Sequence, residues 1–172
     1  KKSPRLSMAN TVKDNIRTRQ IAFLVANGVE ASAVQNLSKK LKAEGAVVHL
    51  IANTMAAVIA EDKTVLTPNH SLQSTSSVCF DAVYIPGGKK SIEKLKNEPA
   101  SIQFVNEAYK HCKTIGFGKQ TESFLELTHV KNTLGKDPAI HVETGTGFPK
   151  AFIQAVGMHR IWELEAERQN PA

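Results

Sequence analysis

Short apolar runs alternate with helical patterns along this chain, and the alternation limits the folds that it can adopt. Residues 20–26 and 46–52 are nearly continuous apolar runs, typical of strands buried on both faces. Between these runs, apolar side chains recur at helical spacing, at Ala33, Val34, Leu37 and Leu41. Gly45 follows as a stop signal. This order predicts two parallel strands joined by a right-handed helical crossover.

The rest of the chain continues the alternation. Further strands are predicted within 56–68 (two, about the turn at 61–63), up to Ile85, over 114–117 and over 139–143. Helices are predicted near 92–95, from Pro99 to about 111, over 121–127 and from Pro149 to about 165, with a loop or short helix at 71–77. We therefore expect an α/β fold with a mainly parallel sheet and helices on both faces.

Length and charge favour one domain behind a basic leader. The 172 residues, 41% of them hydrophobic, suffice for one ordinary core. The net charge is +6, but six basic residues and Asp14 give +5 within residues 1–19, which leaves the remainder nearly neutral. We predict an extended linker or leader at 1–18 and a domain at 19–172. This distribution argues against a nucleic-acid partner.

Targeting signals are not apparent in the sequence. No apolar run reaches the 18 or more residues of a membrane span, so no membrane partner is predicted. No signal-peptide pattern opens the chain, and a cytoplasmic location is the expectation. The first residue is Lys1 instead of Met, which suggests a processed product or a piece of a longer protein.

Two glycine-containing turns fall where parallel sheets form their sites, at the carboxyl ends of strands. Gly87 and Gly88 follow the strand that ends at Ile85. Residues 114–120 read as a strand passing sharply into a helix, where many α/β enzymes mount a nucleophile. The residue at the expected tip is Gly116, which has no side chain. The chain is thus predicted to keep a site's architecture without its nucleophile.

These motifs resemble those of the PfpI-like, class I glutamine-amidotransferase-like superfamily. Residues 81–88 (Asp-Ala-Val-Tyr-Ile-Pro-Gly-Gly) are similar to its strand-and-glycine motif, and residues 114–120 to its nucleophile elbow. The resemblance implies a flavodoxin-like three-layer sandwich, with the paired glycines shaping an oxyanion pocket in active members. It also implies a degenerate site without catalytic residues, formed by Gly116 (nucleophile), Phe117 (histidine), Ala33 (acid), Gly87 and Gly88.

One branch of the superfamily is more similar still, the C-terminal domain of large-subunit haem catalases. The likeness spans the chain, at 3–11, 77–88, 108–111 and 159–162. It implies a non-catalytic accessory domain that stabilises the catalase subunit and homotetramer, with the rest of the subunit as its partner. Hydrogen peroxide decomposition and haem would then belong to the core of the parent enzyme. Activity of the domain itself stays open, with none the expectation.

Two alternative functions stay open beside this one. The isolated domain could bind unfolding client proteins as a chaperone does, through apolar surface. It could also retain PfpI-type hydrolase activity, or bind a small molecule in the pocket left by Gly116. Cys79 and Cys112 are predicted to be small buried or half-buried hydrophobes instead of reactive thiols.

No cofactor or metal is predicted in this domain. Its tyrosines are Tyr84 and Tyr109, and neither has an arginine one helical turn before it, as the tyrosinate ligand of a haem catalase does. The six histidines are dispersed, without metal-ligand spacing. Residues 145–147 (Gly-Thr-Gly) are predicted to form a turn. The apolar stripe after it is predicted to be core, at Phe152, Ile153, Val156, Ile161 and Trp162.

Overall fold

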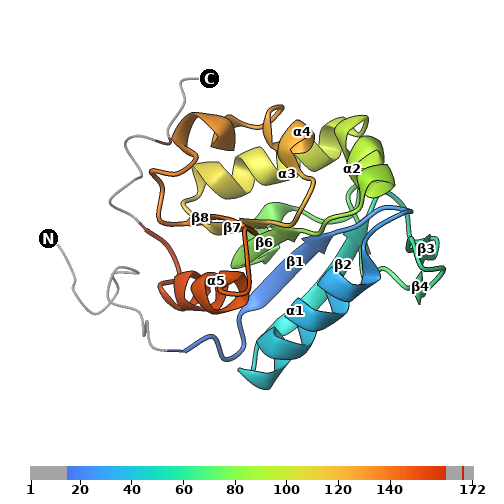
Figure 1. Cartoon of the computed structure of the whole chain (residues 1–172). Coiled ribbons are helices and arrows are strands. Elements are labelled where there is room, and N and C mark those ends of the chain that lie inside the picture. Colours follow the sequence, from blue (N-terminus) through green and yellow to red (C-terminus); the bar gives the residue numbers. More distant parts are fainter. Residues whose placement is uncertain (1–14, 162–167, 169–172) are drawn as a thin grey trace, which may run out of the picture.

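A parallel six-stranded sheet forms the middle layer of this protein (Figure 1). The structure is a computed structural model, and it describes residues 15–161 and Arg168. The strand order of the sheet is β5-β2-β1-β6-β7-β8. The strands are β1 (Gln20–Leu24), β2 (Val47–Ala52), β5 (His70–Ser71), β6 (Ala82–Ile85), β7 (Thr114–Phe117) and β8 (Ile140–Val142). All five pairings are parallel, which confirms the predicted sheet.

Helices cover both faces of the sheet (Figure 1). One face carries α1 (Ala31–Ala43) and α5 (Phe148–Gly157). The other carries α2 (Lys89–Lys96), α3 (Pro99–Lys110) and α4 (Glu122–Leu125). The 3-10 turns η3 (Ser77–Cys79) and η4 (His129–Thr133) connect these elements. The flavodoxin-like three-layer architecture is therefore confirmed.

A short antiparallel hairpin stands outside the main sheet, at the right of Figure 1. It consists of β3 (Val58–Ile59) and β4 (Val65–Leu66), with Lys63 in the left-handed conformation (φ 68°) at its turn. These are the two short strands predicted within 56–68.

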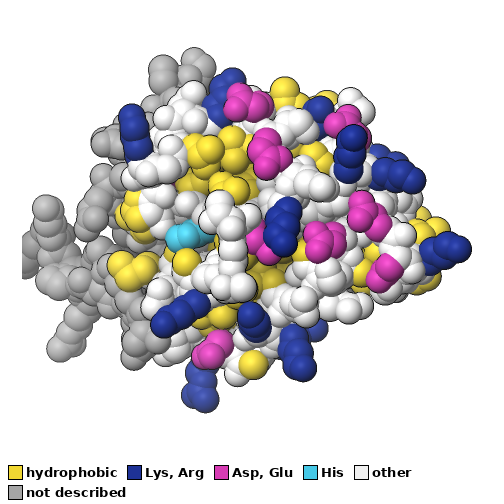
Figure 2. All heavy atoms as spheres, viewed as in Figure 1, with side chains coloured by type: hydrophobic (Ala, Val, Ile, Leu, Met, Phe, Trp, Pro, Cys, Tyr) yellow, Lys and Arg dark blue, Asp and Glu magenta, His cyan; other side chains and the backbone are white. Residues whose placement is uncertain are grey.

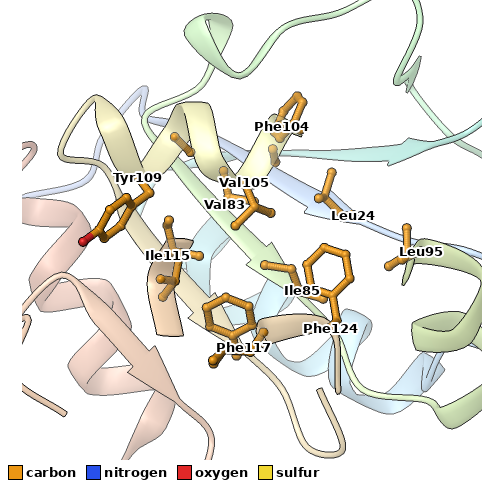
Figure 3. Packing of buried hydrophobic residues seen from close by; sticks show 14 of the residues in the cluster. Leu24, Val83, Ile85, Leu95, Phe104, Val105, Tyr109, Ile115, Phe117 and Phe124 are labelled. Atoms are coloured by element: carbon orange, nitrogen blue, oxygen red, sulfur yellow. The ribbon is translucent and has the colours of Figure 1, made fainter. Parts of the chain in front are cut away.

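The two faces of the sheet have separate cores because side chains alternate along each strand. Figure 3 shows Ile85 of β6 and Phe117 of β7 packing with Phe124 of α4. Tyr84, between Val83 and Ile85, belongs to the opposite core with Phe152 of α5. Tyr84 pairs in register with Gly116 of β7, so Gly116 also faces α5.

Three predicted element boundaries were wrong. Residues 70–71 form β5, which was not predicted and overlaps the loop or short helix expected at 71–77, because a two-residue polar strand has no apolar pattern. The helix predicted over 121–127 is limited to α4. The closing helix ends at Gly157 instead of near 165, and residues 162–165 lie outside the described part.

The early end of α5 has a local cause. His159 adopts the left-handed conformation (φ 67°), which a continuing helix does not allow. Arg160 then forms an antiparallel bridge with Lys113, at the start of β7. Among the described residues, no helix has the length and hydropathy that a membrane span requires.

Candidate functional site

Gly116 lies inside a strand and not on a turn, which corrects the predicted elbow. It is the third residue of β7, held between Tyr84 of β6 and His141 of β8. The φ of Gly116 is not positive. Within the predicted elbow, 114–120, the left-handed residue is Gln120 (φ 61°), which comes after the strand. The pairing of β7 with β6 on one side and with β8 on the other therefore keeps Gly116 extended, and the sharp turn comes later.

The space beside Gly116 is filled by aromatic rings. A Cβ atom added to Gly116 would lie 2.8 Å from Cε2 of Phe152 and 3.1 Å from Cζ of Phe148. These two rings stack at 5.7 Å between centroids, and both contact the ring of Tyr84. Phe152 is fully buried. The predicted small-molecule pocket at Gly116 is therefore wrong, because α5 closes it.

Phe117 and Ala33, the other predicted members of the degenerate site, belong to different surroundings. Phe117 points to the opposite face and is fully buried in the core of α3 and α4 (Figure 3). Ala33 lies half-buried in α1. Adjacent strand residues face opposite sides of a sheet, so Phe117 cannot serve the face that Gly116 occupies.

Gly87 and Gly88 serve the packing of neighbouring turns. The carbonyl of Gly87 accepts a hydrogen bond from the N–H of Glu30, at 2.9 Å. Gly88 has a φ of 115°, and a Cβ there would lie 2.8 Å from the nitrogen of Glu30. These glycines thus let the turns after β1 and β6 meet backbone to backbone, where the strand order reverses.

Two carboxylates and one tyrosine lie at this edge, which the sequence pattern did not reveal. The hydroxyl of Tyr84 donates to Oε2 of Glu143 at 3.4 Å, and the hydroxyl of Ser32 donates to Oε1 of Glu30 at 2.8 Å. Burial first, and then the charges of Glu143 and Glu30, raise the pKa of Tyr84. Its hydroxyl is therefore a neutral donor, a role that does not replace a nucleophile.

Neither cysteine lies at the carboxyl edge. Cys112 follows α3, ahead of β7, and its burial confirms the prediction for this residue. Cys79 is exposed at the end of η3, so its predicted burial was wrong. The 3-10 turn presents this side chain to solvent before the buried strand begins. Both thiols lie near the amino ends of strands, away from the face described above.

A charged cluster occupies the opposite, amino edge of the sheet. Asp81 pairs with Arg19 at 3.5 Å, and Nε2 of His159 lies 3.3 Å from its carboxylate. Lys113 is fully buried, and its Nζ donates to the carbonyl of Ser77 at 2.6 Å. Burial lowers the pKa of Lys113 to about 8. These groups tie the starts of β1, β6 and β7 together.

Two of the six histidines meet in space although they are distant in sequence. Nε2 of His70 lies 3.2 Å from Nδ1 of His49, and both rings contact Phe80. Burial, and then the nearby His70, lower the pKa of His49. Within residues 15–161 and Arg168, no three or more His, Cys, Asp or Glu side chains group as a metal site.

The tyrosines do not fit haem ligation. A haem tyrosinate must be deprotonated and open to the iron, whereas the hydroxyl of Tyr84 is kept protonated among aromatic rings. The ring of Tyr109 is buried and covered by the guanidinium of Arg168, 4.8 Å from its centroid. No step of haem chemistry is assigned to these residues.

Solved structures with this fold include relatives of DJ-1. Oxidized DJ-1 of Toxoplasma gondii has a TM-score of 0.61 and 15% identity, over 88% of this chain and 94% of that chain. A two-domain protein of Anabaena variabilis with DJ-1/ThiJ/PfpI-like and ferritin-like domains has a TM-score of 0.60 and 22% identity. That match covers 63% of this chain and 33% of the other. These likenesses show the fold.

Sequence comparison shows the family. Catalase HPII of Pseudomonas aeruginosa is 35% identical over 96% of this chain and 23% of its own length. Catalase HPII of Pseudomonas putida is 37% identical over 95% of this chain and 22% of its own length. The chain thus spans about a quarter of the length of these relatives. Residues 17–165 match the C-terminal domain found in long catalases, and the chain belongs to that family.

Proposed function

We propose that this chain is a non-catalytic accessory domain of a long catalase, where it stabilises the subunit and the homotetramer. The observation that carries the proposal is the packing of Phe152 and Phe148 over Gly116, the position that the superfamily resemblance aligns with the nucleophile. A domain that fills this space with core side chains contributes folded structure instead of chemistry. The rest of the subunit, with its haem and its peroxide-decomposing activity, is the proposed partner.

The predicted linker at 1–18, of which residues 1–14 lie outside the described part, is proposed to join the domain to that partner. Its last residues are fixed to the domain: Ile16 is buried in the core beneath α1, and the N–H of Thr18 donates to the carbonyl of Gly45 at 2.9 Å. A linker anchored in this way would couple the stability of the domain to that of the proposed partner, the rest of the catalase subunit.

Deleting the domain from a long catalase that carries it tests the proposal. We expect the deletion to shorten the half-life of peroxide-decomposing activity at raised temperature, and to weaken the tetramer in light-scattering measurements. Turnover per haem at 25 °C should be nearly unchanged in the molecules that stay assembled. An unchanged half-life together with unchanged assembly would reject the proposal.

A separate assay tests whether the domain is catalytic. The purified chain is incubated with peptides, esters and glycated amines, and we expect no enzyme-like rate with any of them. Cys79→Ala and Cys112→Ala variants serve as comparisons, because these are the thiols of the chain. A rate that one of these substitutions abolishes would contradict a purely accessory role.

Chaperone-like binding is a second candidate, supported by exposed apolar side chains at one end of the molecule. Figure 2 shows hydrophobic side chains over the end that carries the β3–β4 hairpin. Met55, Ile59 and Val65 there are each more than half exposed. If they bind clients, the chain at equal stoichiometry should suppress light scattering by a heat-aggregating protein, and Ile59→Ser with Val65→Ser should remove the effect. No suppression would reject this function.

A further inference from the structure

The histidines of β2 and β5 form a pair with one ring nitrogen of each within hydrogen-bonding distance of the other. His49 lies in the middle of β2, and His70 begins β5, where it pairs in register with Ile51. Nδ1 of His49 and Nε2 of His70 are 3.2 Å apart, with ring centroids at 5.1 Å and planes inclined at 43°. The buried ring of Phe80 contacts both imidazole rings in edge-on geometry. The rings therefore converge instead of stacking.

A hydrogen-bond chain fixes the orientation and tautomer of His49. The amide nitrogen of Gln20 donates to the carbonyl of Thr18 at 3.0 Å, which turns Oε1 of Gln20 toward the imidazole. Oε1 lies 2.6 Å from Nε2 of His49. Because Oε1 can only accept, Nε2 carries the proton and Nδ1 presents a lone pair toward His70. Metal-binding histidines are oriented in the same manner by an outer carbonyl partner.

We propose that His49 and His70 form a two-histidine site for a late first-row divalent cation, bound by Nδ1 of His49 and Nε2 of His70. Two nitrogens that bind the same zinc ion tetrahedrally, each at about 2.0–2.1 Å, lie roughly 3.3 Å apart. This is close to the separation of 3.2 Å between Nδ1 of His49 and Nε2 of His70. Without a cation, Nε2–H of His70 donates a hydrogen bond to Nδ1 of His49, and the cation replaces this bond when His70 adopts the tautomer with its proton on Nδ1. Both rings are half-buried, so water can complete the coordination.

The donor set determines which cations should bind. Imidazole nitrogens favour Cu²⁺ and Zn²⁺, and Cu²⁺ should bind more tightly than Zn²⁺. Mg²⁺ prefers oxygen ligands and should not bind. Two protein ligands give a weaker site than the three or four of structural and catalytic zinc sites. This inference does not depend on the proposed accessory function.

Calorimetric titration of the tag-free 172-residue chain with Zn²⁺, Cu²⁺ and Mg²⁺ tests the site. We expect one equivalent of Zn²⁺ or Cu²⁺ to bind and to raise the melting temperature, reversibly with a chelator. Two variants each remove one ligand: His70→Ala, and His49→Phe, which keeps a ring over Phe80. Each should weaken binding by at least roughly 10–100-fold, the loss that is typical when a partner of a metal ligand is removed.

Two further variants make the outcome decisive. Gln20→Leu removes the orienting carbonyl and should weaken binding less than the loss of either ring. His129→Ala removes an exposed histidine elsewhere and should leave the affinity unchanged. The inference is overturned if the wild-type chain binds neither ion, or if His49→Phe and His70→Ala bind as tightly as the wild type. A variant that does not fold is identified by circular dichroism, and the other ring variant then decides.

Discussion

The ring of Phe152 occupies the space into which a side chain at Gly116 would project, with Cε2 2.8 Å from the position of the missing Cβ. Phe152 belongs to α5, and Gly116 to the β7 strand that this helix covers. The glycine and the phenylalanine are therefore complementary: the first leaves room, and the second fills it. Phe152 is thus core and belongs to the same buried cluster as Tyr84.

Substituting Gly116 should destabilise the domain without creating activity. Gly116→Ala places a methyl group against Phe152, and overpacking of this kind costs about 1–3 kcal/mol of the free energy of unfolding. Gly116→Cys should cost at least as much and show no hydrolase activity. Urea denaturation measures the loss. The matched control is Gly145→Ala, because nothing lies within 4 Å of a Cβ at that position.

The same packing predicts coupling between the two positions. Phe152→Leu alone should destabilise the domain, but it should reduce the additional cost of Gly116→Ala, because the leucine gives way to the methyl group. Strictly additive losses in the double variant would show that the two side chains do not compete for one space.

A buried ion pair supplies a second stability test. The guanidinium of Arg168 pairs with the carboxylate of Asp137, and both side chains are almost fully buried. Arg168→Met should cost about 3–5 kcal/mol, because it leaves the charge of Asp137 buried without its partner. Adding Asp137→Asn should recover much of this loss in chemical denaturation. A cost below about 1 kcal/mol for the single variant would contradict the observed pairing.

The buried amine of Lys113 should give the domain an alkaline pH dependence. Its pKa is lowered from 10.5 to about 8, chiefly by burial and then by Arg160. Between these two pH values Lys113 is more protonated in the unfolded chain than in the folded domain, so its titration makes the free energy of unfolding rise with pH. The free energy of unfolding of the wild type relative to Lys113→Met should increase by roughly 3 kcal/mol from pH 7 to 10.5. The exposed Lys39→Met should show no such change.

His159 should make the domain sensitive to acid. Burial, and then the charge of Arg19, lower its pKa, although Asp81 opposes the shift. Because the pKa of His159 is lowered in the folded state, the stability that depends on neutral His159 is present above pH 6.5 and is lost as the pH falls. Unfolding at pH 7.5, 6.5 and 5.5 should show a smaller decline for His159→Asn, since asparagine tolerates the left-handed backbone. An equal decline in wild type and variant would assign the sensitivity to other groups.

Local patterns predicted the elements of this fold well. The apolar run at 114–117 coincides with β7, and Pro99 marks the start of α3 because proline is favoured at the first helical position. Continuous apolar runs also predicted the parallel sheet, because they require burial on both faces. These features depend on residues close together in the chain, so the sequence alone carries them.

The candidate site could be predicted only in outline. The sequence predicts that a nucleophile is missing at Gly116, but the filling of the space beside this residue depends on α5, which folds back from much later in the chain. The pairing of His49 with His70 likewise depends on β5, whose two polar residues have no strand pattern. Contacts between distant segments leave no periodicity, and such contacts determine both features.

Folded stability, and no chemistry, is the contribution that we propose for this domain in its parent. The direct test is Phe152→Ala introduced into a long catalase that carries this domain, a change that should cost the domain about 3–5 kcal/mol. We expect the half-life of peroxide-decomposing activity at raised temperature to fall, while turnover at 25 °C stays unchanged. Reduced turnover at 25 °C with an unchanged half-life would contradict the account.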